Sequence, residues 1–348
     1  MHSFDGHNDV LLRLWKQGGD GVAAFLDSES KGQLDLPRAQ AGGMVGGLYA
    51  IFVPSEGKRP PKDPMAAVPY DVPAPPPPEL THAQRATLEM ASLLFRIAER
   101  SGGRVRVARS VADIRAAKAA GAHAPVLHIE GCEALDADLR MLDVLYAAGL
   151  RSLGPVWSRS NIFAHGVPFR FPSSPDTGDG LTDLGERLIK RCNEMRVLVD
   201  LSHMNEKGFW DIARLSNAPL VASHSNAHAL CASSRNLTDK QLAAIRENGG
   251  LVGVNYAVSF LRADGGRIAA TPLDTIVDHI AYLIDHLGED GVGLGSDFDG
   301  AMIPEGLGSA AGLPNLIAAM RARQFGEPLI EKICFENWMR VLARTWGG

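Results

Sequence analysis

His7 and Asp9 stand one residue apart in the stretch SFDGHNDVLL, an imidazole and a carboxylate among apolar neighbours. Side chains two positions apart on a β-strand point to the same face, so both could reach one cation from the same side. Two such residues with this spacing occur often by chance. A polar residue that ends a strand is more often a hydrogen-bonded structural group than a ligand. The pair therefore predicts a metal site only if further ligands converge on it.

Four more polar residues end apolar, β-branched segments further along the chain: Glu130, His203, His224 and Asp297. His203 and His224 end consecutive predicted strands, and neighbouring strands lie about 4.8 Å apart, close enough to share a metal. Three histidines with several carboxylates suit zinc or a similar first-row ion better than magnesium or calcium, which prefer oxygen ligands. The six residues together predict a zinc site.

The elements that must position these residues alternate between strand and helix. Amphipathic segments such as 82–100 and 273–288 have apolar residues every three or four positions. Alternation predicts a parallel sheet, and eight strands in 348 residues favour an α/β fold, the (β/α)8 TIM barrel, over an open sheet. Catalytic groups of that fold lie at the carboxyl ends of strands. The predicted strands are 4–9, 42–53, 124–131, 150–157, 196–203, 219–225, 249–256 and 290–297.

We predict a single domain over 1–348, interrupted once by a proline-rich segment at 54–80. Its proline content is too high for a helix or a central strand. We interpret it as a long surface excursion after the second strand, and its position leaves open a role as a lid or a subunit contact.

Composition excludes several classes of partner. The chain is 45% hydrophobic and 22% charged, with a net charge of -5 and mixed signs along its length. We expect no nucleic-acid partner, because no basic stripe is present. No apolar run is long enough to span a bilayer, and the few residues before His7 leave no room for a signal peptide. We therefore expect no membrane partner and, if Met1 is the natural start, a cytoplasmic protein. The four cysteines form no CxxC pair and are expected to be reduced thiols.

Five ordered motifs resemble the renal (membrane) dipeptidase family of the amidohydrolase superfamily: DGHNDVLLRL, HIEG, VDLSHM, ASHSNAHALCASSRNL and VGLGSDFDGA. They extend across nearly the whole chain. The resemblance implies a barrel with two zinc ions, the first held by His7 and Asp9, the second by His203 and His224, with Glu130 bridging both. Many relatives in the superfamily bridge their metals with a carboxylated lysine on the fourth strand, but LRSLGPVW contains no lysine.

The same resemblance implies a zinc-dependent dipeptidase. Two cations generate a metal-bridging hydroxide near neutral pH, and one of them polarises the scissile carbonyl. Asp297 matches the proton shuttle between that hydroxide and the departing amine. Arg235 matches the arginine that binds the substrate's C-terminal carboxylate, a task suited to its guanidinium fork. The family tolerates a D-residue at the C-terminal position, so L-Xaa-D-Xaa dipeptides are the class to test, and we expect a homodimer as in relatives.

One position departs from the family pattern. Mammalian members place a histidine after the fourth strand to hold the carbonyl oxygen of the tetrahedral intermediate, and this chain has Trp157 there. An indole donates one N–H and carries no charge, so oxyanion stabilisation is weaker or comes from another residue. His165, in the same loop, and Arg159 are alternatives. Tyr256, at the end of the seventh predicted strand, is a candidate for lining the pocket beside Arg235.

Other polar residues are predicted to support the site. His128 shares a strand face with Glu130 one layer deeper, so we expect a core or ligand-supporting role. Asp299 and Asn226 are candidates for orienting ligands, and His228 is expected to support its loop.

Two alternative functions remain open on the sequence. Hydrolysis of N-acyl amino acids would keep the metals and Arg235 but require a different loop around Trp157. A catalytically silent, metal-bearing binding protein is the other alternative. Asp297 argues against it, because a silent protein needs no proton shuttle.

Overall fold

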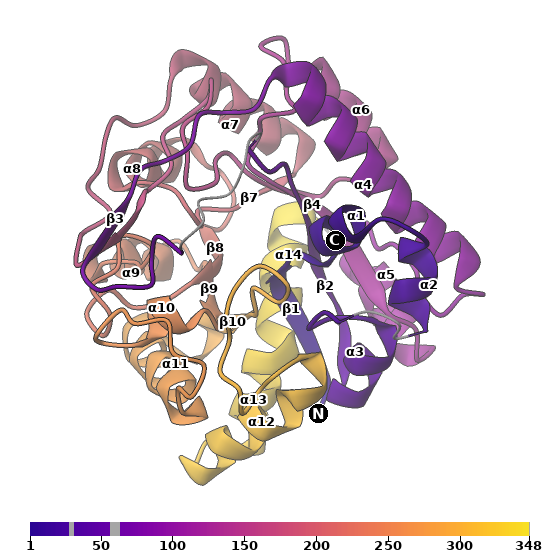
Figure 1. Cartoon of the computed structure of the whole chain (residues 1–348), viewed down its shortest axis with the longest axis vertical. Helices are drawn as coiled ribbons and strands as arrows, with labels where there is room; N and C mark the ends of the chain where they lie inside the picture. Colours follow the sequence, from indigo (N-terminus) through magenta and orange to yellow (C-terminus); the bar gives the residue numbers. More distant parts are fainter. Residues whose placement is uncertain (28–30, 56–62, 348) are drawn as a thin grey trace.

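Eight parallel strands form one sheet in the order β7–β5–β4–β2–β1–β10–β9–β8, in a computed structural model that describes residues 1–27, 31–55 and 63–347 (Figure 1). A parallel bridge between Asp200 and Val221 joins the two outer strands, and Leu201 N donates to Val221 O at 2.8 Å. The sheet is therefore a nearly closed barrel, and the predicted (β/α)8 fold is confirmed. The barrel strands are β1 (Ser3–Asn8), β2 (Met44–Phe52), β4 (Ala124–Glu130), β5 (Ser152–Gly154), β7 (Leu198–Val199), β8 (Val221–Ser225), β9 (Leu251–Asn255) and β10 (Val292–Gly295).

Helices surround the barrel (Figure 1). The two predicted amphipathic segments correspond to α4 (Leu80–Arg100) and α11 (Leu273–Leu287). Within the described residues, no helix combines the length and apolar character that crossing a membrane requires. The α-helices are α1 (Val10–Gln17), α2 (Gly21–Leu26), α3 (Leu36–Gly42), α4 (Leu80–Arg100), α5 (Val111–Ala119), α6 (Arg140–Ala148), α7 (Asp183–Met195), α8 (Glu206–Leu215), α9 (Asp239–Glu247), α10 (Val258–Leu261), α11 (Leu273–Leu287), α12 (Leu313–Ala322), α13 (Glu327–Glu331) and α14 (Asn337–Trp346). Short turns of 3-10 helix (η1, Glu289–Gly291; η2, Ala310–Gly312) and π-helix (η3, Lys332–Glu336) complete the set.

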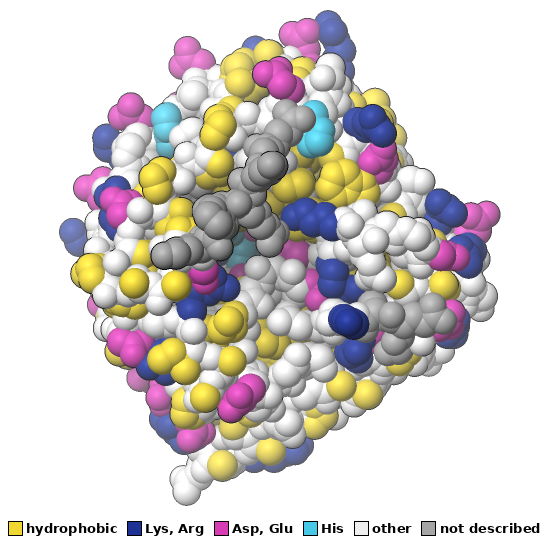
Figure 2. All heavy atoms as spheres, in the orientation of Figure 1, with side chains coloured by type: hydrophobic (Ala, Val, Ile, Leu, Met, Phe, Trp, Pro, Cys, Tyr) yellow, Lys and Arg dark blue, Asp and Glu magenta, His cyan; other side chains and the backbone are white. Residues whose placement is uncertain are grey.

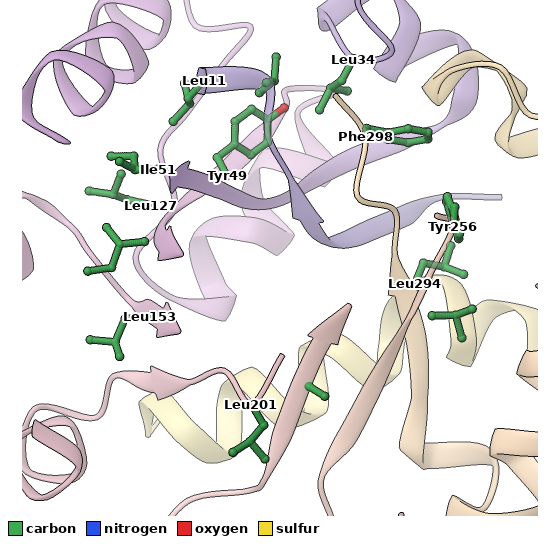
Figure 3. Close-up of a cluster of buried hydrophobic side chains, with 14 of the residues drawn as sticks. Leu11, Leu34, Tyr49, Ile51, Leu127, Leu153, Leu201, Tyr256, Leu294 and Phe298 are labelled. Carbon is green, nitrogen blue, oxygen red and sulfur yellow. The ribbon is translucent and has the colours of Figure 1, made fainter. Parts of the chain in front are cut away.

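The hydrophobic core lies between the strands and the surrounding helices (Figure 3). Leu127 and Leu153 come from neighbouring strands, and Leu11 comes from α1 (Figure 3). All three are fully buried. The four cysteines are buried free thiols, as predicted.

Trp338 of α14 fills one end of the barrel interior. A Cβ on Gly6 or Gly293 would lie under 3.0 Å from its indole, so both positions require glycine for this close approach. Trp338 Nε1 donates to Leu294 O at 2.9 Å, and the ring packs on Phe4 with centroids 5.9 Å apart. The polar site must therefore lie toward the other end, where the strands have their carboxyl termini.

Part of the predicted excursion at 54–80 is held against the loop that follows β5. The short strand β3 (Tyr70–Val72) pairs antiparallel with β6 (Phe169–Phe171), outside the barrel sheet. Asp71 forms an ion pair with Arg170 at 2.8 Å. Residues 56–62 of the excursion lie outside the described residues.

Two barrel strands are shorter than predicted. The segment 150–157 forms a strand only over Ser152–Gly154, and 196–203 only over Leu198–Val199. Pro155 supplies no N–H to continue the first strand. In the second, the Asp200 side chain accepts the N–H of Ser202 at 3.0 Å, which replaces a bond between strands. The residues predicted at these strand ends therefore lie on loops.

Candidate metal centre and substrate site

Six buried polar side chains converge at the carboxyl ends of the barrel strands. Two lie within strands near their ends, one is the last residue of a strand, and three lie just beyond strands. Acidic and histidine side chains are visible in the hollow near the centre of the face shown in Figure 2. The six are the predicted His7, Asp9, Glu130, His203, His224 and Asp297, none more than 9% exposed.

One carboxylate oxygen of Glu130 lies near three imidazoles, those of His7 on β1, His224 on β8 and His203 in the loop after β7. Glu130 Oε1 is 2.9 Å from His203 Nε2, 3.4 Å from His224 Nε2 and 3.6 Å from His7 Nε2. The two Nε2 atoms of His203 and His224 are 3.1 Å apart. A carboxylate in this position can contact a cation on each side, which is what a bridging carboxylate requires.

His7 also faces a second group of carboxylates. Its Nε2 is 3.5 Å from Asp9 Oδ2, and ligand atoms of His7, Asp9 and Asp297 all lie within 4.8 Å of one another. The His7 ring stacks on that of His224 with centroids 3.8 Å apart. The pair predicted from the start of the sequence thus lies beside the pair predicted from the fifth and sixth strands.

The chemistry of these donors fits a divalent cation. Both ring nitrogens of His7 and Oδ1 of Asp9 are buried and have no hydrogen-bond partner among the described residues. Buried polar atoms are normally satisfied, so the lone pairs of the His7 imidazole and of Asp9 Oδ1 need an electron-pair acceptor, which a cation supplies. Imidazole nitrogens with carboxylate oxygens are ligands typical of zinc.

Charge repulsion and burial dominate the electrostatics of the cluster. Burial raises the pKa of Glu130 and of Asp297, since both carboxylates are shielded from water. Burial alone would lower the pKa of His7, but Glu130, Asp9 and Asp297 outweigh it and raise the pKa to about 10. Burial lowers the pKa of His203 and His224 well below the usual value, which favours the neutral, ligating form. The raised pKa of His7 shows that the three neighbouring carboxylates favour a positive charge at this position.

Three residues that hold the cluster in place were missed by the sequence analysis. Ser158 Oγ lies 2.7 Å from His203 Nδ1, and Ser223 Oγ lies 2.8 Å from His224 Nδ1. Asn255 Nδ2 donates to Asp297 Oδ2 at 2.9 Å. Asn255 is the last residue of β9, so the rule that identified the other strand ends would also have found it. The serines carry no comparable signal, because serine is common in every kind of loop.

Arg235 is buried next to this cluster without an ion-pair partner among the described residues. Its NH2 group donates to His224 O at 3.1 Å, NH1 donates to Ser225 Oγ at 3.4 Å, and Nε has no partner. Burial lowers its pKa, and Asp297, Glu130 and Asp200 act in the opposite direction. A buried guanidinium with an unpaired edge suits an anion that is supplied from outside.

The residues considered for oxyanion stabilisation are placed differently from one another. The Trp157 ring lies 5.8 Å from that of His203, centroid to centroid. Arg159 is fully buried, and its Nε donates to Glu133 Oε1 at 2.8 Å while NH2 donates to the Val53 carbonyl. The suggestion that Arg159 could stabilise an oxyanion is therefore corrected, since its donors are already engaged.

Two further predicted substrate contacts differ in their surroundings. His165 Nδ1 is 2.9 Å from Ser160 Oγ, within its own loop. Tyr256 is fully buried, with its ring packed against Phe298 at 5.8 Å in the core shown in Figure 3. Packing of the phenol against another aromatic ring explains why a residue at a strand end turns away from the pocket.

The predicted supporting residues act mainly on loops and neighbouring strands. His128 is fully buried and its Nδ1 lies 2.9 Å from Ser152 Oγ. Asn226 donates to the Asn255 carbonyl at 2.9 Å, and His228 Nε2 lies 2.9 Å from the Ser173 carbonyl.

Asp299 does not contact the histidines. It accepts from the Gln33 N–H at 2.6 Å and pairs with Arg13 Nε at 2.9 Å, which connects the loop after β10 to the segment before α3 and to α1.

Comparison with known proteins places this geometry in a family. Residues 1–346 match the model of the membrane dipeptidase family, peptidase family M19. An uncharacterised protein encoded in the pqqA 5′ region of Klebsiella pneumoniae is 51% identical over 258 residues, which is 74% of this chain and 95% of that protein.

Two solved structures resemble the whole fold. The metallopeptidase dipeptidase AC of family M19 is 51% identical, with a TM-score of 0.97 over 100% of this chain and 99% of that one. A metallopeptidase from Rhodobacter sphaeroides, solved with a phosphinate mimic of the dipeptide L-Ala-D-Ala, is 51% identical, with a TM-score of 0.96 over 99% of both chains. The chain belongs to the membrane dipeptidase family, peptidase family M19.

Proposed function

We propose that the chain is a metal-dependent dipeptidase that hydrolyses the peptide bond of small dipeptides. The observation that carries this proposal is the position of Glu130 Oε1, within 3.6 Å of the Nε2 atoms of three histidines. The unpaired Arg235 lies within electrostatic reach of the same carboxylate. A site for two cations beside a site for one carboxylate fits a substrate with a peptide bond next to a free C-terminus.

The proposed cofactor is a pair of zinc ions. His7 and Asp9 would hold the first, His203 and His224 the second, and Glu130 would bridge them. Two bound cations would acidify a shared water and polarise the scissile carbonyl. The mixed imidazole and carboxylate donors support zinc over magnesium or calcium.

Asp297 is the proposed proton carrier. Asn255 occupies Oδ2 of that carboxylate, which fixes its plane and leaves Oδ1 as the atom that takes the proton and delivers it to the departing amine. Its closeness to His7 and Asp9 supports this role, because the attacking water would bind beside those residues.

Arg235 is the proposed anchor of the substrate's C-terminal carboxylate. Its guanidinium is held by the His224 carbonyl and stacks over Phe260, 5.4 Å from Cζ to the ring centroid. This support restricts its rotation, so less side-chain entropy is lost when a carboxylate binds.

Trp157 remains in the proposed substrate site as an apolar wall. Its ring lies 4.9 Å from Phe52 and 5.3 Å from Phe169, centroid to centroid, beside His203. Tyr256 packs in the core and is left out of the proposed site, whereas His165, in the same loop as Trp157, stays a proposed donor to the oxyanion. The dipeptide mimic bound to the Rhodobacter sphaeroides relative supports L-Xaa-D-Xaa dipeptides as the first substrates to test.

The test is amino-acid release by zinc-loaded protein from L,L-dipeptides, L,D-dipeptides and N-acyl amino acids. We expect release from free dipeptides, and a loss of about 10²- to 10⁴-fold in kcat for Asp297→Asn at unchanged metal content. Release only from N-acyl amino acids would replace the dipeptidase proposal with the N-acyl hydrolase. A protein that holds two zinc ions and cleaves none of the substrates would be a silent metal-binding protein.

A further inference from the structure

Beneath the proposed metal centre, Asp200 holds a serine of the next strand at two points. Asp200 Oδ1 accepts the backbone N–H of Ser223 at 2.7 Å, and Oδ2 accepts the Ser223 hydroxyl at 2.5 Å. Oδ1 also accepts the N–H of Ser202 at 3.0 Å. Asp200 is 1% exposed, so water does not compete for these bonds.

The direction of these hydrogen bonds determines which ring nitrogen of His224 carries the proton. A carboxylate only accepts, so the single hydroxyl proton of Ser223 is directed to Asp200. The Ser223 oxygen is then an acceptor on its other side, where His224 Nδ1 lies at 2.8 Å. His224 must therefore carry its proton on Nδ1 and present the lone pair of Nε2, the atom that faces Glu130 Oε1 at 3.4 Å.

Other partners of the Asp200 and Ser223 side chains lie farther away. Ser202 Oγ is 3.5 Å from Ser223 Oγ, and His128 Nε2 is 3.8 Å from Asp200 Oδ2, beyond hydrogen-bond distance. Asp200 Oδ2 is 4.0 Å from His224 Nδ1, so the carboxylate acts on the imidazole through the hydroxyl rather than directly.

We propose that Asp200 and Ser223 are positioning residues that fix the ligating tautomer and orientation of His224. This inference rests on the proposed metal site. Groups that hold the second nitrogen of a metal-binding histidine commonly change metal affinity by about 10- to 100-fold when removed. The pair therefore increases the affinity of the His203–His224 side of the centre for a cation.

A second aspartate–serine pair in the chain, Asp5 and Ser296, has the same hydrogen bonds but does not contact an imidazole. Asp5 Oδ1 accepts the Ser296 N–H at 2.7 Å, and Oδ2 accepts the Ser296 hydroxyl at 2.9 Å. The other contacts of the Ser296 oxygen are with backbone and not with an imidazole: it accepts the Phe298 N–H at 3.1 Å, and the His7 carbonyl is a second acceptor for its proton at 3.0 Å. Ser296→Ala therefore removes an equivalent buried hydroxyl without changing the tautomer of a histidine.

The experiment measures zinc dissociation constants of the full chain by competition with a chromophoric chelator. We expect Ser223→Ala to raise one of the two zinc dissociation constants by about 10- to 100-fold. Ser223→Thr, which keeps the hydroxyl, is expected to restore wild-type affinity, and Ser296→Ala to stay within about threefold of it. Equal losses in Ser223→Ala and Ser296→Ala, or none in Ser223→Ala, would overturn the positioning role.

A second measurement needs no substitution at Ser223. In metal-free wild-type protein labelled with ¹⁵N-histidine, the signal that disappears in His224→Asn should show the Nδ1–H tautomer. The Nε2–H tautomer would refute the inference. Failure of the two proposals is distinguishable: wild-type protein that binds no zinc contradicts the proposed function, whereas tight zinc binding with an unaffected Ser223→Ala contradicts only the positioning role.

Discussion

Gly300 lies directly against the carboxylate of Asp9. A Cβ on Gly300 would fall well under 3.0 Å from Asp9 Oδ2 and also from Asp297 Oδ1. The backbone of Gly300 is not in the left-handed region, so alanine is excluded by the two carboxylates rather than by its own conformation.

Gly300→Ala is therefore expected to displace one ligand and the proton carrier while leaving the fold intact. We expect zinc affinity to fall at least about tenfold and dipeptide hydrolysis to be lost, since ligand atoms must be held within a few tenths of an ångström. Gly306→Ala, where a Cβ meets only Leu273 at ordinary contact distances, is the control. Unchanged zinc affinity in Gly300→Ala, measured by chelator competition, would contradict this assignment.

Replacement of Arg235 should separate substrate binding from stability. Arg235→Met removes a buried charge with no ion-pair partner among the described residues, so the melting temperature should stay the same or rise. The loss of the carboxylate anchor should lower kcat/KM for free dipeptides by roughly 10- to 100-fold, mainly through KM. Steady-state kinetics on a dipeptide and on its C-terminal amide provide the check. An amide that loses as much as the free acid would disprove the anchoring role.

Buried neutral histidines should make the metal-free protein sensitive to acid. Burial lowers the pKa of His279 to about 4, and its ring is already used: Nδ1 accepts the Ala227 N–H at 3.2 Å and Nε2 lies 2.9 Å from the Leu261 carbonyl. The unfolded chain binds a proton near pH 6.5 and the folded chain does not, so stability is full above pH 6.5 and falls as the pH drops toward 4.

The variant His279→Gln tests that linkage, because an amide can accept and donate at the same two positions without titrating. The free energy of unfolding should fall less steeply below pH 6.5, by up to about 1.4 kcal/mol per pH unit. Urea unfolding at pH 5 and 7.5, with chelator present in both, gives the slope. Parallel curves for variant and wild type would show that His279 does not contribute.

Metal removal should destabilise the chain reversibly. Asp9, Glu130 and Asp297 are buried close together, and a bound cation would offset part of their mutual repulsion. A cation that binds only the folded state contributes about 2.7 kcal/mol at a free concentration of 100 times its dissociation constant. A chelator should lower the melting temperature, and added zinc should restore it. If the melting temperature of the zinc-loaded protein did not change when the chelator removed the zinc, this expectation would be wrong.

The sequence by itself predicted the barrel and its six converging polar residues. Periodicity is local, so alternating strands and helices could be identified without tertiary information. Parallel strands bring their carboxyl ends to one end of a barrel, so residues as far apart as His7 and Asp297 could be assigned to one place. The ordered motifs supplied the proposed roles of Glu130 and Arg235.

Only the tertiary structure decided which side chains face the site and which neighbours hold them. Tyr256 ends a strand like the ligands do, yet packs on Phe298, and Arg159 is engaged by Glu133. Asp200, Ser223 and the imidazole of His224 meet because β7 and β8, consecutive strands joined through α8, close the barrel side by side. Their hydrogen bonds depend on distances of tenths of an ångström between chain segments, and spacing along one chain cannot encode such distances.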